Sequence, residues 1–242
     1  MVLKVLGSSS KGNCYLLEAS DGVLVIEAGI PATEVKKALG FDLLKVAGCL
    51  VSHRHGDHSR FLKDVLSLGV RVLALEDVFA SHGLSGSPFC KPIEPLRGYR
   101  LGGFRVFALP VAHDVPCLGF IVDHREMGRL LFVTDTMMLE YTVPQLDHVM
   151  LEVNYCDRIL QANIDAGIVP ASMRDRLMRS HMELLTAKDI VRANDLSRVK
   201  ELVLLHLSDN NSHAAMFREE MEKASGKPVY VARRGLEVNL WK

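Results

Sequence analysis

Short apolar runs separated by turn-forming residues dominate the first half of the chain. Runs of this kind, bounded by Gly, Asp, Asn and Ser, are typical of β-strands. The strands expected on this basis are residues 2–6, 14–19, 23–27, 46–52, 70–75, 104–109, 118–122 and 130–134, with residues 20–22 closing a hairpin. Two helices are expected at 31–39 and 61–68, because each stretch is followed by a glycine that commonly ends a helix.

The second half of the chain is richer in helix formers. Residues 157–194 are expected to be mostly helical, with breaks at Pro170 and again near Ser180. Strands are expected at 149–153 and 201–205, a helix at 214–224, and a closing pair of strands at 229–232 and 236–240. Many short strands with helices at intervals predict two packed sheets with helices outside, and no linker divides residues 1–242, so we expect a single domain.

Composition excludes several classes of protein. The chain has 242 residues, 48% of them hydrophobic and 24% charged, which argues against disorder and allows a sizeable core. Its apolar runs are far shorter than the roughly 20 residues that a membrane span requires, and no secretory signal pattern opens it. The 29 basic and 29 acidic side chains cancel, so any attraction to nucleic acid must come from a local patch.

The five cysteines are widely spaced and include no Cys-x-x-Cys pair. This spacing predicts neither a disulfide framework nor a thiolate zinc site. A reducing, cytoplasmic location is therefore expected.

The histidines carry the strongest chemical signal. After a run expected to be a buried strand, the chain reads Ser-His-Arg-His-Gly-Asp-His over residues 52–58. In extended backbone His53 and His55 point to the same side, and Gly56 permits a turn that returns Asp57 and His58 to the same centre. Imidazole nitrogens and a carboxylate so close together predict a site for zinc, manganese or iron.

Three further candidate ligands also stand at the ends of expected strands. They are His113, Asp135 and His206, each placed where an apolar run stops. A sandwich of sheets brings such strand-end loops together, so we expect these side chains to join the same cluster. The remaining histidines outside the motif, apart from His181, lack this placement and are expected to be surface or structural residues: His82, His124, His148 and His213.

His-x-His-x-Asp-His followed by a later His, a later Asp and a final His resembles the metallo-β-lactamase superfamily. The resemblance implies an α/β fold, a four-layer αββα sandwich with two divalent metal ions at one edge. It also implies the ligands: His53, His55 and His113 for one ion, Asp57, His58 and His206 for the other, and Asp135 as the bridge. Two departures remove no ligand: Glu27 stands where the superfamily usually has Asp, and Thr136-Met137 replaces Thr-Gly.

Within the superfamily, residues 7–13, 151–154 and 205–211 resemble the YycJ/WalJ group, which is related to ribonuclease Z and to phosphonate-metabolism phosphodiesterases. This resemblance implies hydrolysis by a hydroxide held between the two metals, with Asp57 among the catalytic residues. It also points to His181 as the general acid and to Glu152 as the residue that orients it, although Ser180 and residues 182–183 depart from the usual Gly-His-Leu-Ser.

The loop of residues 8–13 offers hydroxyls and backbone N–H groups that suit a phosphate. The candidate substrate-binding residues are Ser10, Lys11, Asn13, Asn154, Ser208 and Asn210. Three arginines at near-helical spacing, Arg174, Arg176 and Arg179, form either a basic stripe for a nucleic-acid backbone or a solvated helix face.

The leading hypothesis is a metal-dependent phosphodiesterase or nuclease, exonuclease-like by resemblance, with DNA or RNA as substrate. The alternative is a phosphodiesterase for a small molecule such as a cyclic nucleotide, which the neutral charge and the short chain favour. An ester or lactone hydrolase is a third hypothesis. Thioester hydrolysis is disfavoured, because Asp-Val-Pro follows His113 in place of a Gly-rich segment. No membrane partner is expected, and the oligomeric state stays open.

Overall fold

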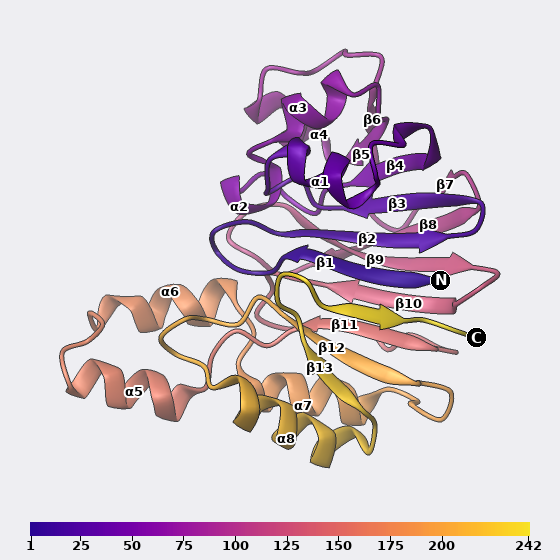
Figure 1. The fold of residues 1–242 in the computed structure, drawn as a ribbon. Helices are drawn as coiled ribbons and strands as arrows, with labels where there is room; N and C mark the ends of the chain where they lie inside the picture. Colours follow the sequence, from indigo (N-terminus) through magenta and orange to yellow (C-terminus); the bar gives the residue numbers. More distant parts are fainter.

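The computed structural model describes residues 1–242 and places two β-sheets face to face between two layers of helices (Figure 1). The first sheet has, in spatial order, β14 (Glu237–Asn239), β1 (Val2–Gly7), β2 (Cys14–Ala19), β3 (Gly22–Ile26), β4 (Val46–Leu50), β5 (Val72–Ala74) and β6 (Cys90–Pro92). The second has β13 (Val229–Val231), β12 (Glu201–Leu205), β11 (His148–Glu152), β10 (Gly128–Val133), β9 (Cys117–His124), β8 (Phe104–Val111) and β7 (Gly98–Leu101). This arrangement confirms the expected four-layer sandwich.

The helices divide between the two outer faces. Those packed on the first sheet are α1 (Ala32–Ala38), α3 (Leu62–Ser67) and α4 (Glu76–Ser81), with the short η1 (Leu43–Lys45) and α2 (Gly56–Ser59) in connecting loops. Those packed on the second are α7 (Leu184–Ala193) and α8 (Ala214–Ser225), while α5 (Asp157–Asp165) and α6 (Ser172–Ser180) form a helical hairpin that projects beyond the sheets (Figure 1). None of the helices is long and apolar enough to cross a membrane.

Alternation along β10 shows how one strand serves two cores. Leu130 and Phe132 belong to a cluster of 25 buried residues between the sheets, whereas Leu131 and Val133 belong to a cluster of 19 under α7 and α8. Successive side chains of a strand point to opposite faces, so a strand covered on both sides must be apolar throughout. This explains why the strands of the sequence are nearly unbroken apolar runs.

Most expected elements are present with shifts of one or two residues at their ends. The helical region of residues 157–194 is broken at both predicted places, and α6 ends at Ser180 because His181 has extended backbone. The helix α4 and the strands β6 and β7 were not expected, and all three are short.

The expectation of a closing pair of strands is wrong. β13 pairs in parallel with β12 in the second sheet, whereas β14 pairs antiparallel with β1 in the first. Between them the chain crosses from one sheet to the other, and Ala232, Val238 and Leu240 all contribute to the core between the sheets. Each strand therefore extends the edge of a different sheet, which their apolar pattern alone does not reveal.

The strand directions bring chemically active loops to one edge of the sandwich. β3 runs parallel to β4, and β10, β11 and β12 are mutually parallel. β8 is antiparallel to β9, which is antiparallel to β10, so β8 runs in the same direction as β10. The loops that follow all these strands therefore meet at the same edge, and they contain every predicted metal ligand.

Candidate metal centre

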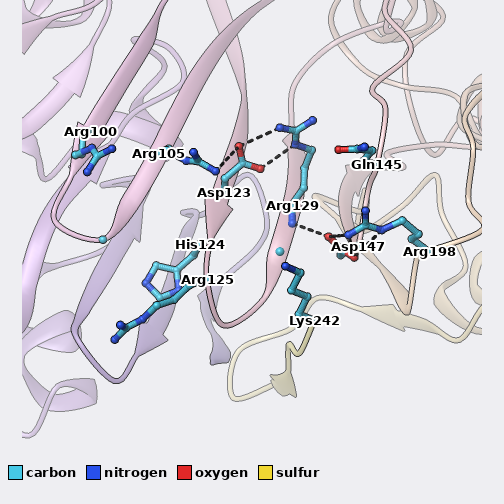
Figure 2. A pocket seen from close by; sticks show the side chains of 12 residues that line it. Arg100, Arg105, Asp123, His124, Arg125, Arg129, Gln145, Asp147, Arg198 and Lys242 are labelled. Carbon is cyan, nitrogen blue, oxygen red and sulfur yellow. Dashed lines mark hydrogen bonds and ion pairs between the residues drawn. The ribbon is translucent and has the colours of Figure 1, made fainter.

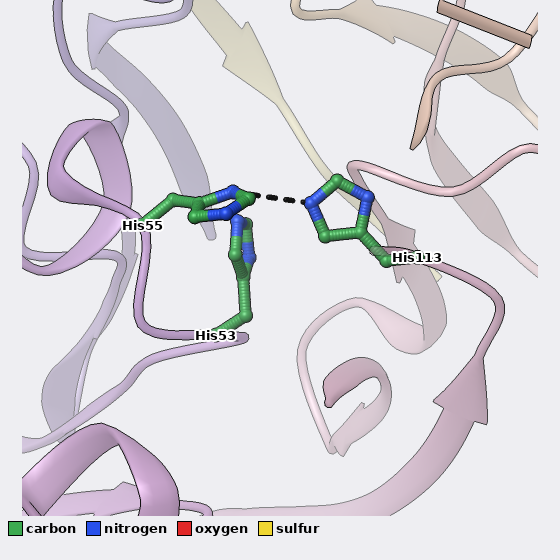
Figure 3. Close-up of side chains that lie close together, drawn as sticks. All are labelled: His53, His55 and His113. Carbon is green, nitrogen blue, oxygen red and sulfur yellow. Dashed lines mark hydrogen bonds between the residues drawn. The ribbon is translucent and has the colours of Figure 1, made fainter. Parts of the chain in front are cut away.

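Three histidines from the two sheets form the first cluster of candidate ligands (Figure 3). His53 and His55 follow β4, and His113 follows β8; one nitrogen from each ring lies within 4.8 Å of the others. His113 Nε2 is 3.2 Å from His55 Nδ1, and the ring of His53 lies close beside that of His55. The three rings thus converge on one small space between the sheets.

The other nitrogens of two of these rings are already held by the protein. His113 Nδ1 donates to the carbonyl oxygen of Ser180 at 2.8 Å, and His53 Nδ1 pairs with the hydroxyl of Ser52 at 2.9 Å. In a neutral ring this leaves Nε2 of His113 with a free lone pair. Burial lowers the pKa of both His53 and His113, which favours the neutral rings that bind metals.

One nitrogen of this cluster has no hydrogen-bond partner. It is Nε2 of His53, which is buried. A buried polar nitrogen without a partner is costly and rare. A cation bound by the His53, His55 and His113 rings would accept its lone pair, so the residues present fit a metal ion.

The second cluster consists of Asp57, His58, Asp135 and His206. His58 Nε2 lies 3.3 Å from Oδ2 of Asp57 and 3.3 Å from Oδ1 of Asp135, and His206 Nε2 lies 3.2 Å from Oδ2 of Asp57. The other oxygen of Asp135 is 3.9 Å from His53 Nε2, so its carboxylate lies between the two clusters. This is the position that a carboxylate shared by two ions needs.

In the second cluster, the carboxylates and the imidazole rings stabilise each other's charged forms. Burial raises the pKa of Asp135, but His206 and His58 outweigh burial and hold this pKa well below its usual range. Burial lowers the pKa of His206, but Asp135, Asp57 and Glu152 outweigh it and raise the pKa to about 10. Divalent cations would replace these protons as the counter-charge, since metal binding displaces protons from its ligands.

Buried groups behind the ligands hold them in place. Glu27 Oε1 lies 3.4 Å from His58 Nδ1, on the side of the ring that faces away from the cluster, and Glu27 Oε2 accepts a hydrogen bond from Ser52 N. Glu27 Oε1 and His58 Nδ1 are close but do not share a hydrogen bond, so it is the bond to Ser52 that fixes the Glu27 carboxylate beside the ring. The Glu27 departure noted in the sequence thus places a carboxylate beneath the histidine loop.

The backbone is strained at the same place. Glu27, Asp135 and His206 have positive φ angles of 70°, 43° and 54°, which non-glycine residues rarely adopt. Strain of this kind persists only where the surrounding structure over-determines it, and it concentrates at functional sites. Gly29 supports the packing, because a Cβ there would lie 1.7 Å from the carbonyl oxygen of Asp57.

His181 and Glu152 form a carboxylate–imidazole pair beside the two clusters. His181 Nδ1 lies 2.7 Å from Glu152 Oε1. Glu152 is fully buried, and its Oε2 accepts hydrogen bonds from the backbone nitrogens of Thr136 and Met182. Burial lowers the pKa of His181, but the charge of Glu152 outweighs it and raises the pKa above its usual value. The pair therefore favours the protonated form of His181, whose side chain is still 15% exposed.

The same pair also belongs to a third group of potential ligands. Asp135, Glu152, His181 and His206 each offer an atom within 4.8 Å of the others. A metal-ligand role for His181 is thus the competing assignment, and it predicts loss of metal when the ring is removed, which a general acid does not.

Comparison with protein families decides the identity of the fold. A model of the metallo-beta-lactamase superfamily matches residues 9–198. The chain belongs to this superfamily. No curated protein matches it in sequence.

Solved structures of the superfamily fold span the whole chain. YhfI from Bacillus subtilis has a TM-score of 0.73 at 18% identity, covering 98% of this chain and 99% of its own. The short form of human tRNase Z has a TM-score of 0.65 at 16% sequence identity, and the match covers 99% of both chains. A diphosphatase of the PhnP family has a TM-score of 0.64 at 16% sequence identity, and the match covers 98% of this chain and 97% of the diphosphatase. An isothiocyanate hydrolase and a diiron beta-hydroxylase also share the fold, so likeness at this identity shows the fold and not the reaction.

Two adjoining hollows open at the superfamily's metal edge. The first has a volume of about 290 Å³ and is lined by ligands of both clusters, and the second has about 270 Å³. Both are lined by Ser10, Arg176, His181 and His206. They therefore form one continuous groove with His181 at the junction.

Some of the candidate substrate-binding residues line this groove and others do not. Ser10, Asn154, Ser208 and Asn210 line the second hollow. Lys11 does not line either hollow, and its exposed ammonium lies 3.5 Å from Asp209 on the surface.

Asn13 is a correction to the sequence-based assignment. It is 0% exposed and lines neither hollow. Its amide nitrogen contacts His58 Nε2 at 3.0 Å and Asp57 Oδ2 at 3.3 Å. Asn13 thus positions two ligands, because the backbone of its loop packs directly against the Asp57 segment and leaves its side chain no path to solvent.

Sequence reasoning missed two groups in the groove. Asp114 Oδ1 lies 3.1 Å from His113 Nε2, and its position next to a predicted ligand was the available signal. Arg176 was treated only as part of a helical stripe, yet it alone of the stripe's arginines lines both hollows. No local pattern distinguishes it from Arg174 and Arg179, since the fold of the α5–α6 hairpin decides which arginine faces the groove.

Proposed function

We propose that this protein is a phosphodiesterase dependent on two divalent cations, zinc or manganese with iron as a further option, and that it acts on nucleic acid or nucleotides. The observation that carries the proposal is the His181–Glu152 pair beside two ligand clusters in one groove. An alkoxide that leaves phosphorus is strongly basic and benefits from a general acid. A thiolate that leaves a thioester needs no such proton.

When bound, the cations would supply an activated water at neutral pH and neutralise the charge of a phosphate. The chain's own residues have three tasks. The two ligand clusters would hold the cations, one in each cluster, with the Asp135 carboxylate between them. His181 lines both hollows and would donate the proton to the leaving group. Arg176 is the one arginine or lysine that lines the groove, and it is suited to a phosphate of the substrate.

The finer choice of substrate rests on resemblance and shape. Residues 7–13, 151–154 and 205–211 resemble the YycJ/WalJ group, which supports an exonuclease acting on DNA or RNA, and tRNase Z shares the fold. The second candidate, a small-molecule phosphodiesterase, is favoured by the second hollow. Its volume of about 270 Å³ and its lining of serine, asparagine and a few apolar side chains suit a single nucleotide.

A substrate panel tests the proposal. Protein loaded with manganese or zinc is given single- and double-stranded DNA, RNA, a cyclic nucleotide, bis(p-nitrophenyl) phosphate, a thioester, a lactone and a β-lactam. We expect turnover of phosphodiesters above all others. Asp135→Ala protein purified in parallel controls for contaminating nucleases. Robust thioester or lactone turnover with every phosphodiester untouched would overturn the proposal.

Replacement of Arg176 by alanine is expected to raise KM for a nucleotide substrate about 10- to 100-fold with little change in kcat. A hydrogen bond to a charged group contributes about 1.5–3 kcal/mol, and uniform binding energy appears in KM alone. Arg176 has no carboxylate partner, whereas Arg174 is held by both oxygens of Asp157 at 2.6 and 2.7 Å. Steady-state kinetics measure the effect.

Arg179→Ala is the matched control for this variant. Arg179 is exposed on the same helix and lines neither hollow, so its KM should stay within about twofold of the wild type. An unchanged KM in Arg176→Ala, or an equal rise in both variants, would show that Arg176 does not contact substrate.

A further inference from the structure

A basic hollow, separate from the groove, lies at the edge of the sandwich opposite the metal centre. Figure 2 shows the side chains that line it. It has a volume of about 460 Å³. Its walls come from the start of β8 and of β10, the end of β9 and the residue before β11. The metal-binding loops follow the other ends of β8, β10 and β11, so the two sites are separated by the length of these strands. We call it the distal hollow.

The distal hollow is lined by arginine. Its five arginines are Arg100, Arg105, Arg125, Arg129 and Arg198, and Lys242 lies at its rim. Against these arginines stand two carboxylates, Asp123 and Asp147, and no lining residue is hydrophobic. The chain as a whole has no net charge, so this excess of positive charge is a local feature and not a consequence of composition.

Both carboxylates are already engaged in holding guanidinium groups. Asp123 accepts from Arg129 Nε at 2.8 Å and from Arg129 Nη2 at 3.1 Å. Asp147 is buried, accepts from Arg198 Nη2 at 2.9 Å and also accepts from the backbone nitrogen of Arg129. These contacts fix two planar guanidinium groups in the hollow (Figure 2). Such fixed donors lose less entropy when they bind an anion.

Two other arginines lack a carboxylate of their own. Arg100 makes no ion pair, and Arg105 approaches only Asp123, at 3.9 Å and with 68% of its side chain exposed. Asp123 is already bound at both oxygens by Arg129. Arg125, at the far rim, pairs with Asp21 at 3.3 Å. Arg100 and Arg105 therefore present free donors along the same hollow as the fixed guanidinium groups of Arg129 and Arg198.

We propose that the distal hollow binds a small molecule that carries two or more phosphate groups. The guanidinium fork matches phosphate oxygens in pairs, and the volume falls in the range of roughly 300–1,000 Å³ typical of small-molecule sites. No Phe, Tyr or Trp side chain lines the hollow itself, and the side chain of His124 is buried against Asp21, so the groups offered to a ligand are mainly guanidinium and other polar groups. Recognition rests on charge.

Titration calorimetry with inorganic triphosphate at low ionic strength tests the proposal on the full chain. We expect the wild type to bind, and the double variant Arg100→Ala/Arg105→Ala to bind about 10- to 100-fold more weakly. Added salt should weaken binding further, since these side chains are exposed. Because neither arginine holds a structural carboxylate, the double variant should keep the thermal unfolding midpoint of the wild type.

Three control variants locate the binding. Asp135→Ala and Arg176→Ala alter the metal centre and its groove, and Arg218→Ala removes an exposed arginine of α8; all three should bind triphosphate as the wild type does. Loss of binding in Asp135→Ala or Arg176→Ala alone would assign the anion to the metal centre and overturn the proposal. So would equal affinity of the double variant and the wild type. Tighter binding of duplex DNA with the same dependence on Arg100 and Arg105 would overturn the small-molecule assignment.

Discussion

Replacement of Asp135 by alanine is expected to strip metal from the protein and to abolish phosphodiester hydrolysis. The carboxylate lies 3.3 Å from His58 Nε2 and 3.9 Å from His53 Nε2, so it is placed between the two ligand clusters, where both ions could share it. Loss of a group that only supports a ligand costs about 10- to 100-fold in affinity or activity, and loss of a shared ligand should cost more. Metal analysis of protein purified without chelator should find about two equivalents in the wild type and fewer in the variant.

His213→Ala is the control for this prediction. His213 is exposed, caps the start of α8 and lies outside every cluster, so its removal should leave metal content and turnover unchanged. His55→Ala should resemble Asp135→Ala in losing metal, because it removes one of only three ligands in the first cluster. A metal-free Asp135→Ala protein with full activity would show that these clusters are not the catalytic metal centre.

Replacement of His181 by alanine is expected to slow substrates with an alkoxide leaving group by ~10²–10⁴-fold while metal content stays intact. The ring of His181 is partly exposed in the groove and lies 2.7 Å from Glu152, whose charge outweighs burial and raises the pKa of the ring. A p-nitrophenolate leaving group needs little protonation, so its release should suffer far less. Parallel kinetics on bis(p-nitrophenyl) phosphate and on a dinucleotide measure the difference.

Glu152→Gln should show the same dependence on the leaving group in a milder form. The amide keeps the shape of the side chain but loses the charge that raises the pKa of His181. If His181→Ala slows both substrates equally, or lowers metal content, then His181 is a ligand of the third group and the acid must be another residue.

The fold class was predictable because its signal is local. Buried strands are nearly continuous apolar runs, and the helix breaks at Pro170 and Ser180 follow from backbone chemistry within a few residues. The partnership of the last two strands was not predictable. β13 and β14 are both three-residue strands, and nothing in their own residues says that one pairs with β12 and the other with β1.

The candidate site shows the same division. By itself, the sequence determined that His53, His55, Asp57 and His58 lie together, because alternation along an extended strand and one glycine turn bring them to one side. It also placed His113, Asp135 and His206 at strand ends. Only the tertiary structure decided that these ends share one edge, since that depends on strand directions set by pairings far apart in the chain.

The tertiary structure alone also decided which polar residues face solvent in the groove and which are buried behind it. Asn13 and Asn210 are similar in kind, yet the first is buried beneath Asp57 and the second is exposed and lines a hollow. Arg174 is tied to Asp157, while Arg176 faces the groove two residues later. The physical reason is that exposure and charge pairing depend on neighbours from distant segments. The distal hollow, whose arginines come from several separate strands and loops, is the clearest case.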